Sequence, residues 1–239
     1  MAKRGKKYRA AAEKIDPEKF YPPAEAIALV KGSSITKFDS TVDVHIRTGV
    51  DPRHSEQQVR DIVALPHGVG KEVIVLVFAE GEGAKLAREA GADHIADDNE
   101  MIKKIQGGWT GFDVAISTPA MMAKAGRLGK VLGPRGLMPN PKAGTVVPDK
   151  DLPRAIEEVK SGRIEFRVDK TANVHVSIGK ASFEENQLFE NFSALMAAIR
   201  KARPAATKGT YVQRVTLVTS MGPGVKVDPN QAIALELAD

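Results

Sequence analysis

Residues 72–79 read EVIVLVFA, and after Glu72 this stretch contains no charged side chain, Gly or Pro. A strand that is apolar at every position is typical of a parallel sheet, because helices cover both faces of such a sheet. The chain after it alternates between strand and helix patterns, with strands expected at 94–96 and 112–117 and helices at 84–90, 100–105, 119–125 and 152–160. This alternation predicts a small Rossmann-like α/β domain built on a parallel sheet.

The two ends of the chain carry a different pattern, in which apolar and polar side chains alternate. This pattern occurs in Thr41–Arg47 (TVDVHIR), Arg163–Val168 (RIEFRV) and Asn173–Ile178 (NVHVSI), and a further strand is expected at Val212–Thr219. A period of two leaves one face of a strand packed and the other in water, which is typical of antiparallel sheets.

Capping residues predict where two helices begin. Ser182–Arg203 is the longest helical pattern, and Ser182 and Glu185 have the spacing of a capping box. Asp151 is the expected N-cap of the helix at 152–160, and Pro153 falls in the first turn of that helix.

These patterns predict an α+β protein with an inserted α/β domain. The first domain is a discontinuous antiparallel α/β sandwich formed by residues 1–67 and 160–239. The second is a small Rossmann-like parallel sheet formed by residues 68–159, and a length of 239 residues fits two domains. The chain would cross between them at Gly68–Gly70 and Ser161–Gly162, where Gly permits unusual backbone angles.

Composition excludes several classes of protein. The absence of Cys excludes a disulfide framework, a thiolate metal site and a Cys nucleophile. The longest apolar run, Val73–Ala79, is far shorter than the roughly 20 residues of a membrane helix. The basic N-terminus is not followed by the apolar stretch of a secretory signal. We therefore expect a cytoplasmic protein that has no membrane partner.

Positive charge is concentrated outside the predicted α/β domain. Between Gly68 and Lys160 the chain has 13 basic and 13 acidic side chains, whereas the flanking segments have 22 basic and 17 acidic ones. Three clusters contain cations and no carboxylate: Lys3, Arg4, Lys6, Lys7 and Arg9; Lys124, Arg127, Lys130, Arg135 and Lys142; and Arg200, Lys201, Arg203, Lys208, Arg214 and Lys226. A polyanion favours such surfaces, because each neutralised phosphate releases counterions. The alternative is a set of solvated faces.

Motifs of nucleotide-binding enzymes are incomplete in this sequence. Gly81–Ala84 (GEGA) lacks the third small residue of a dinucleotide-binding loop, and Glu82 would repel a pyrophosphate. Gly68–Lys71 and Gly126–Lys130 do not match a phosphate-binding loop. Metal-ligand spacing is absent from the five histidines, which are His45, His54, His67, His94 and His175. We therefore predict no catalytic residue, cofactor or metal, and an α/β enzyme is the weaker alternative.

His45 and His175 fall on the polar register of their predicted strands, so surface roles account for both.

The strongest single feature is a segment rich in Gly and Pro. Gly126–Gly144 reads GRLGKVLGPRGLMPNPKAG and contains four cations and no acid. We expect a loop that cannot bury a core, with cations that meet phosphates and with Leu137 and Met138 exposed as an apolar contact. A disordered linker is one alternative, and Gly133–Gly136 has the G-x-x-G form of the backbone-clamping loop in KH domains.

The same segment resembles a known family. GKVLGPRGLMPNPKAGTV (Gly129–Val146) closely resembles the signature of the first-numbered protein family of the large ribosomal subunit, which forms the mobile lateral stalk. The resemblance continues in Lys37–Asp43 (KFDSTVD), Arg163–Gly179 and Thr219–Gly224 (TSMGPG), so it extends over nearly the whole chain.

The resemblance implies a structural RNA-binding protein whose first domain is made from both chain ends and whose second domain is inserted. The first domain would bind the stalk region of 23S rRNA and the leader of the family's own operon mRNA, so the protein would also be a translational repressor. Because the stalk moves as deacylated tRNA leaves, exit-site tRNA and other large-subunit components are implied partners. The free protein is expected to be a monomer. The runner-up is a free-standing repressor whose chief ligand is mRNA.

By similarity, residues from separate segments would contact rRNA. They are Lys37, Phe38 and Thr41; Asp169, Lys170 and Thr171; and Lys208, Gly209, Thr210, Ser220, Met221 and Gly222. Hydroxyls and backbone N–H groups can reach 2′-hydroxyls and phosphates, while Phe38 or Met221 can cover a sugar or a base. The alternative for Phe38 is a core position, and the alternative for residues 220–224 is an ordinary hairpin turn.

The inserted domain is expected to contribute a weaker contact to tRNA or rRNA. The side chains that would make this contact are Lys130, Arg135 and Lys142 in the Gly/Pro-rich segment.

Overall fold

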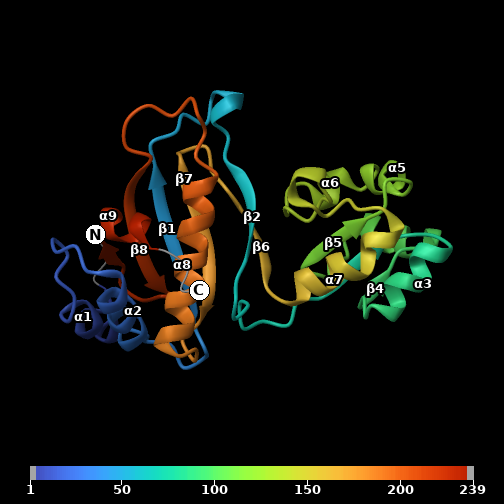
Figure 1. Ribbon diagram of the computed structural model, residues 1–239. Helices are drawn as coiled ribbons and strands as arrows, with labels where there is room; N and C mark the ends of the chain where they lie inside the picture. Colours follow the sequence, from blue (N-terminus) through green and yellow to red (C-terminus); the bar gives the residue numbers. More distant parts are fainter. Residues whose placement is uncertain (1–3, 236–239) are drawn as a thin grey trace. The chain divides into compact units, whose positions relative to one another are not determined.

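The chain divides into two units in the computed structural model, which describes residues 4–235 apart from the side chain of Lys142 (Figure 1). The discontinuous unit consists of Met1–Gly70 with Ile164–Asp239, and the inserted unit consists of Lys71–Arg163. The boundaries drawn from the sequence, 67/68 and 159/160, lie close to this division and stay predictions for independently folding domains. Lys3 of the first basic cluster lies outside the described residues.

The inserted unit is built on a parallel sheet with the strand order β4-β3-β5. Its strands are β3 (Val75–Phe78), β4 (His94–Ile95) and β5 (Val114–Ser117). Its helices are α3 (Glu82–Glu89), α4 (Asn99–Gln106), α5 (Met122–Gly126), α6 (Gly129–Leu132) and α7 (Leu152–Lys160), with 3-10 turns η2 (Pro141–Ala143) and η3 (Asp149–Asp151). The predicted Rossmann-like class is therefore confirmed.

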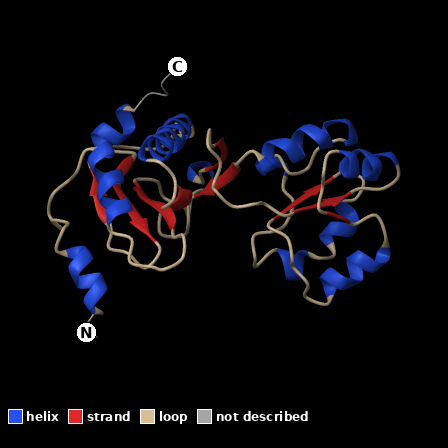
Figure 2. Ribbon diagram, turned by 90° about the horizontal axis from the view of Figure 1, so that it is seen from below, coloured by secondary structure: helices blue, strands red, loops and turns tan. Residues whose placement is uncertain are grey.

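Helices cover both faces of this parallel sheet (Figure 2). Leu76 and Phe78 of β3 are buried in one core with residues of α4, α5 and α6. Val75 and Val77 point to the opposite face and are buried with residues of α3 and α7. An apolar strand is stable only with both faces covered, which is why EVIVLVFA predicts this architecture.

The Gly/Pro-rich segment packs onto the inserted unit, so the expectation that it cannot bury a core was wrong. Leu132 at the end of α6 is fully buried. Leu137 and Met138 are partly buried against the same core and are not exposed as predicted. The Leu137 N–H donates to the Leu132 carbonyl across 3.0 Å, which closes the intervening turn on α6. The segment therefore lies against the inserted unit because Leu132, Leu137 and Met138 pack on its core.

The discontinuous unit is built on an antiparallel sheet with the strand order β7-β1-β8-β9. Its strands are β1 (Thr41–Thr48), β7 (Asn173–Lys180), β8 (Val212–Thr219) and β9 (Val225–Val227), and a separate two-stranded sheet pairs β2 (Arg60–Ala64) with β6 (Arg163–Arg167). Its helices are α1 (Lys6–Ala12), α2 (Pro23–Gly32), α8 (Glu185–Lys201) and α9 (Pro229–Ala234), with the 3-10 turn η1 (Ser55–Gln57). The N-terminal strand β1 thus lies between two C-terminal strands.

Helices cover only one face of the antiparallel sheet. The apolar register of β1, which is Val42, Val44 and Ile46, is buried in one core with Leu188 and Phe192 of α8. The polar register of β1 points to the other face, which the described helices of this unit do not cover. The predicted antiparallel α/β sandwich is therefore confirmed, and it leaves one face of its sheet bare.

Two predicted helix caps differ from the structure. The N-cap of α8 is Glu184, which forms a capping box with Gln187. The predicted capping residue, Ser182, instead donates from its N–H and hydroxyl to the Asp39 carboxylate at 3.0 and 2.7 Å. Asp151 precedes α7 as predicted but forms no capping hydrogen bond, because its backbone is helical (φ −94°, ψ −2°) where capping requires an extended residue.

Five helices and strands were not predicted from the sequence: α1, α2, β2, α6 and α9. Each is short or lacks a clear hydrophobic period, and α2 and α9 are marked mainly by a Pro in the first turn.

Candidate nucleic-acid interface

The rRNA-contact residues implied by the resemblance fall into two groups at opposite ends of β1. The Met221 cluster consists of Lys37, Phe38, Thr41, Ser220, Met221 and Gly222. The Asp169 cluster consists of Asp169, Lys170, Thr171, Lys208, Gly209 and Thr210. Strand β1 has 8 residues and is roughly 25 Å long at about 3.3 Å per residue, so the two groups do not form one contiguous patch.

Hydrogen bonds between β1 and β8 assemble the Met221 cluster. The Ser220 N–H donates to the Thr41 carbonyl at 3.0 Å, and the Thr41 N–H donates to the Ser220 hydroxyl at 3.3 Å. The Lys180 ammonium donates to the Thr41 hydroxyl at 2.9 Å. Because the Ser220 hydroxyl oxygen accepts from backbone, its proton is left to donate outward.

Phe38 is 63% exposed, so the alternative of a core position was wrong. The loop that presents it is fixed on both sides. Asp39 binds Ser182, and the Thr36 hydroxyl donates to the Phe38 carbonyl at 2.9 Å. A fixed backbone holds the aromatic ring in water, where it is ready to cover an apolar surface.

Met221 is held in a strained backbone conformation with its side chain in solvent. Its φ is 62° and its side chain is 76% exposed. Positive φ costs a residue with a Cβ on the order of 1 kcal/mol, and such outliers concentrate at functional sites. At Gly222 an added Cβ would lie 2.3 Å from the Thr219 hydroxyl, so the turn is tight. The segment is a hairpin turn between β8 and β9, and its geometry displays an apolar side chain.

The Asp169 cluster is organised by the carboxylate of Asp169. This carboxylate accepts hydrogen bonds from the Asn173 N–H, the Thr171 N–H and the Thr171 hydroxyl, each at 2.8 Å. Burial acts to raise the pKa of Asp169, but these hydrogen bonds outweigh it and lower the pKa to about 2. Asp169 therefore shapes the turn, and the neighbouring Lys170 and Thr171 are the exposed side chains.

Lys208, Gly209 and Thr210 join this cluster through the chain that enters β8. All three are exposed. The Gly49 N–H, just after β1, donates to the Tyr211 carbonyl at 2.7 Å. The Thr48 N–H donates to the Ala172 carbonyl at 2.9 Å. The end of β1 therefore binds both Ala172 and Tyr211, which follow Thr171 and Thr210, and so holds the two segments of the cluster side by side.

Between the two clusters lies a bare sheet surface that sequence reasoning did not assign to the site. This open face consists of the outward residues Asp43, His45, Arg47, Asn173, His175, Ser177, Arg214, Thr216, Val218 and Lys226. It contains three Lys or Arg, two His and one carboxylate. The polar register of the alternating strands was the available signal, but strand pairing was needed to bring its residues together.

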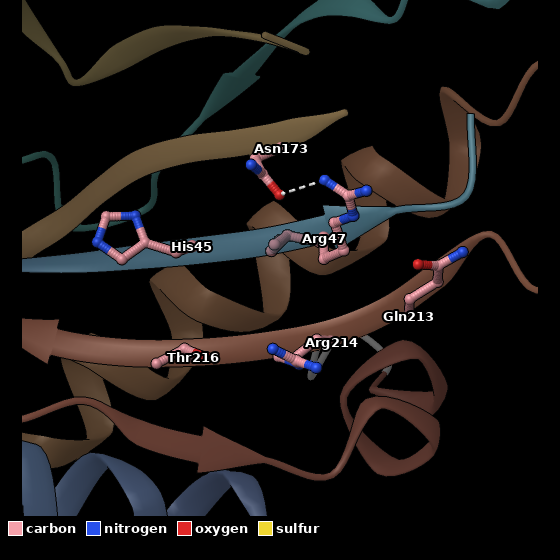
Figure 3. Close-up of a pocket in the computed structure, with 7 residues that line it drawn as sticks. His45, Arg47, Asn173, Gln213, Arg214 and Thr216 are labelled. Carbon is pink, nitrogen blue, oxygen red and sulfur yellow. Dashed lines mark hydrogen bonds between the residues drawn. The ribbon is translucent and has the colours of Figure 1, made fainter. Parts of the chain in front are cut away.

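The open face is hollowed near its middle (Figure 3). The hollow has a volume of about 380 Å³ and is lined by His45, Ile46, Arg47, Asn173, Gln213, Arg214 and Thr216. Three strands contribute these side chains, which belong to β1, β7 and β8. The lining is polar and carries two guanidinium groups, so it is suited to an anion.

The cations of the Gly/Pro-rich segment differ in their surroundings. Lys130 in α6 is exposed. Arg135 is exposed and donates to the Thr110 hydroxyl. Lys142 lies in η2, and its side chain is outside the described part of the chain. Just before this segment Lys124 pairs with Glu80. Of the described cations in the cluster from Lys124 to Lys142, Lys124 alone has an ion-pair partner.

The G-x-G segment after β3 is unsuited to a dinucleotide. It leads into α3, and an added Cβ at Gly83 would lie 2.7 Å from a carboxylate oxygen of Asp149. Glu82 adds a second carboxylate at the start of this helix. Two negative charges at a helix N-terminus repel a pyrophosphate.

Residues 4–235 contain neither a metal site nor a membrane-spanning helix. Within that range no group of three or more His, Asp or Glu is arranged to hold a metal ion. Over the same range no helix has the length and apolar character needed to cross a membrane.

Comparison with known proteins agrees with the resemblance seen in the sequence. Residues 29–223 match the model of the Ribosomal protein L1p/L10e family. The chain is 57% identical over 229 residues to the large ribosomal subunit protein uL1 of Chloroflexus aurantiacus, which covers 96% of this chain and 97% of the relative. It is 58% identical over 228 residues to the protein of the same name from Chloroflexus aggregans, which covers 95% and 96%. The predicted family is confirmed, and the enzyme alternative is excluded, because this is a family of structural ribosomal proteins. The chain belongs to the ribosomal protein L1p/L10e family.

Proposed function

We propose that this protein is a structural component of the large ribosomal subunit that binds 23S rRNA through its discontinuous unit. The observation that supports this most is the pair of exposed clusters at the two ends of one bare, cation-bearing sheet face. Its place of action is the cytoplasmic ribosome, and by family membership the complex it helps to form is the mobile lateral stalk.

The chemistry of the two clusters suits folded RNA. The Met221 cluster offers Phe38 and Met221 as apolar covers for a sugar or base, and it offers the Ser220 hydroxyl as a donor. The Asp169 cluster offers Lys170 and Lys208 for phosphates and Thr171 for a 2′-hydroxyl. Rigid, exposed groups at two fixed points favour an RNA of defined shape over an extended strand.

The inserted unit has a lesser part in this proposal. Its charges nearly balance, and its sheet is covered on both faces, so loops and the outer surfaces of helices are left for contact. We assign to Lys130, Arg135 and Lys142 a weaker contact with exit-site tRNA or rRNA, which would couple stalk movement to release of deacylated tRNA.

Repression of translation is a second candidate function. The leader of the protein's own operon mRNA would bind the same surface when no rRNA is free. The test is competition between the two RNAs. We expect excess stalk rRNA to displace the mRNA leader, whereas simultaneous binding of both RNAs would contradict a shared site.

The main proposal is tested by substituting Phe38 in the full chain. Phe38→Ala should weaken binding to a stalk rRNA fragment by about 1–3 kcal/mol, because stacking of a base on an aromatic ring is lost. The measurement is fluorescence anisotropy at fixed salt, with circular dichroism to verify folding.

Phe20→Ala is the matched control. Phe20 is 52% exposed in the same unit, and it lies beside the edge strand β9, where the Tyr21 N–H donates to the Lys226 carbonyl. It belongs to neither cluster, so affinity should change by less than about twofold. Equal losses for both variants, or no loss for Phe38→Ala, would contradict the assigned surface.

A further inference from the structure

A pair of histidines lies in the middle of the open face. His45 of β1 and His175 of β7 are directly opposite in the strand register, and their Nδ1 atoms are 2.8 Å apart. Their rings meet edge to face, with centroids 4.9 Å apart. At this distance one Nδ1 must carry a hydrogen and the other a lone pair, so the two rings share one hydrogen bond.

This geometry allows the pair to gain one proton without losing its hydrogen bond. In the neutral pair, the ring that donates through Nδ1 has a free lone pair on Nε2. A proton that binds there makes this ring a cation and strengthens its Nδ1 hydrogen bond to the other ring. A second proton would place two N–H groups face to face and break the contact. The pair therefore accommodates one positive charge.

The charged groups around the pair come from β1, β8 and β9 and from the turn before β7. Asp43 and Arg47 flank His45 on β1, and the Asp43 carboxylate accepts a hydrogen bond from the Ser177 hydroxyl at 2.6 Å. An Asp169 carboxylate oxygen lies 3.5 Å from His175 Nε2. From β8 the neighbour is Arg214, and from β9 it is Lys226, which pairs with Thr216 beside His45.

Partial burial lowers the pKa of His45 below its ordinary value. The adjacent His175 lowers the pKa further, and Asp43 opposes both effects. The ring is thus mainly neutral near pH 7 in the free protein. An anion that binds beside it would favour the charged form.

Two arginines next to the pair lack an acidic partner. Arg47 and Arg214 are directly opposite each other on β1 and β8, where like charges repel. Arg47 donates to the Thr171 carbonyl and, at 3.5 Å, to the Asn173 side-chain oxygen (Figure 3), and both acceptors are neutral. Among residues 4–235 no carboxylate forms an ion pair with either arginine. An anion between them would turn this repulsion into attraction.

We propose that the hollow on the open face binds a phosphodiester group of the RNA backbone, and that the His45–His175 pair takes up a proton as it binds. This inference rests on the proposed function and adds a third contact between the two clusters. It makes RNA affinity depend on pH. Since the bound state holds more protons than the free state, binding tightens as pH falls through the range in which imidazole titrates.

The test measures the affinity of the full chain for a stalk rRNA fragment at pH 6 and pH 8. For the unmodified chain we expect binding about threefold to fivefold tighter at pH 6, because a pKa rise of about one unit on binding gives its full tenfold gain only well below the pKa of the free pair. The double variant His45→Asn/His175→Asn should lose this difference. The matched control His54→Asn/His67→Asn removes two histidines of the same unit that lie off the open face, and it should retain the difference.

The outcomes separate this inference from the proposed function. Tight binding with a pH difference that both double variants keep would overturn the histidine role and leave the proposed function standing. Binding that does not change with pH would do the same. Failure of the unmodified chain to bind the rRNA at either pH would overturn both.

Salt dependence tests the arginine part of the site. Arg214→Gln should lower the slope of log affinity against log salt by about one, because one phosphate contact is lost. Arg200→Gln is the control, since Arg200 is exposed on α8, which packs on the opposite face of the sheet. Equal slopes for the two variants would rule out a phosphate at the hollow.

Discussion

The two units differ in what their sheets leave exposed. The parallel sheet of the inserted unit has helices on both faces, so its strand side chains are almost all buried. The antiparallel sheet of the discontinuous unit has helices on one face, so half of its strand side chains meet water. The first architecture leaves loops for function, whereas the second offers a rigid surface on which charged and aromatic groups keep fixed positions.

This difference explains why cations have unequal value in the two units. Arg47 and Arg214 are held in strand register and lack an acidic partner among the described residues. In the inserted unit Lys124, by contrast, is neutralised by an ion pair with Glu80. Counting charges along the sequence treats these residues alike.

The largest expected effect comes from separating the units. A chain that joins residues 1–70 to 164–239 through a short glycine linker should keep rRNA affinity within a few fold. Isolated residues 71–163 should bind on the order of 1,000-fold more weakly, as non-specific binding does. Filter binding at fixed salt measures both. Comparable rRNA affinity for the two pieces would contradict the assignment of RNA binding to the discontinuous unit.

A core substitution in the inserted unit should leave RNA binding unaffected. Leu76 is fully buried, so Leu76→Ala should destabilise that unit by about 2–5 kcal/mol. Calorimetry should show a lower transition for one unit, while rRNA affinity stays within about twofold. The nearby Ile74→Ala, at a side chain 40% exposed, is the control and should cost less. A parallel loss of affinity would show that the inserted unit shares in primary binding.

Substitution of Met221 should change the rRNA affinity of the discontinuous unit without lowering its stability. Met221→Gly should weaken rRNA binding by about 1 kcal/mol, because apolar contact is lost. Its thermal stability should not fall, since Gly tolerates the positive φ. Met221→Ala removes the same contact and keeps the strain. Unchanged affinity in both variants would contradict an apolar contact at this turn.

The smallest effect concerns the pH dependence of stability. The pKa of Asp169 is lowered from its ordinary value of 3.8 to about 2, so its carboxylate stabilises the fold above pH 3.8. That contribution is lost as pH falls from 3.8 toward 2. Its side chain is 38% exposed, so solvent screening limits the effect to roughly 1 kcal/mol. Urea unfolding of Asp169→Asn should show a shallower loss over this window, and identical curves would contradict the carboxylate's role.

Much of the fold was predictable because its signals are local. A continuous apolar strand predicted the parallel sheet, and alternating strands predicted the four-stranded antiparallel sheet, although β6 pairs with β2 in a separate sheet. Helix α7 begins where expected. Ser182 was misassigned because its hydroxyl does not accept from a backbone N–H of the helix but donates to Asp39, which is 143 residues away in sequence. Leu137 and Met138 were misassigned for a similar reason, since nothing local indicates which core a Gly-rich loop will meet.

The sequence by itself determined the family, the two sheet types and the residues with hydroxyl, aromatic or cationic chemistry, because each follows from residue type and short-range period. Only the tertiary structure decided which of these residues share a surface. It separated the implied contact residues into two clusters along β1 and brought His45 within hydrogen-bonding distance of His175, 130 residues away. The physical reason is strand pairing, which joins distant segments in one register and aligns their outward side chains on one face.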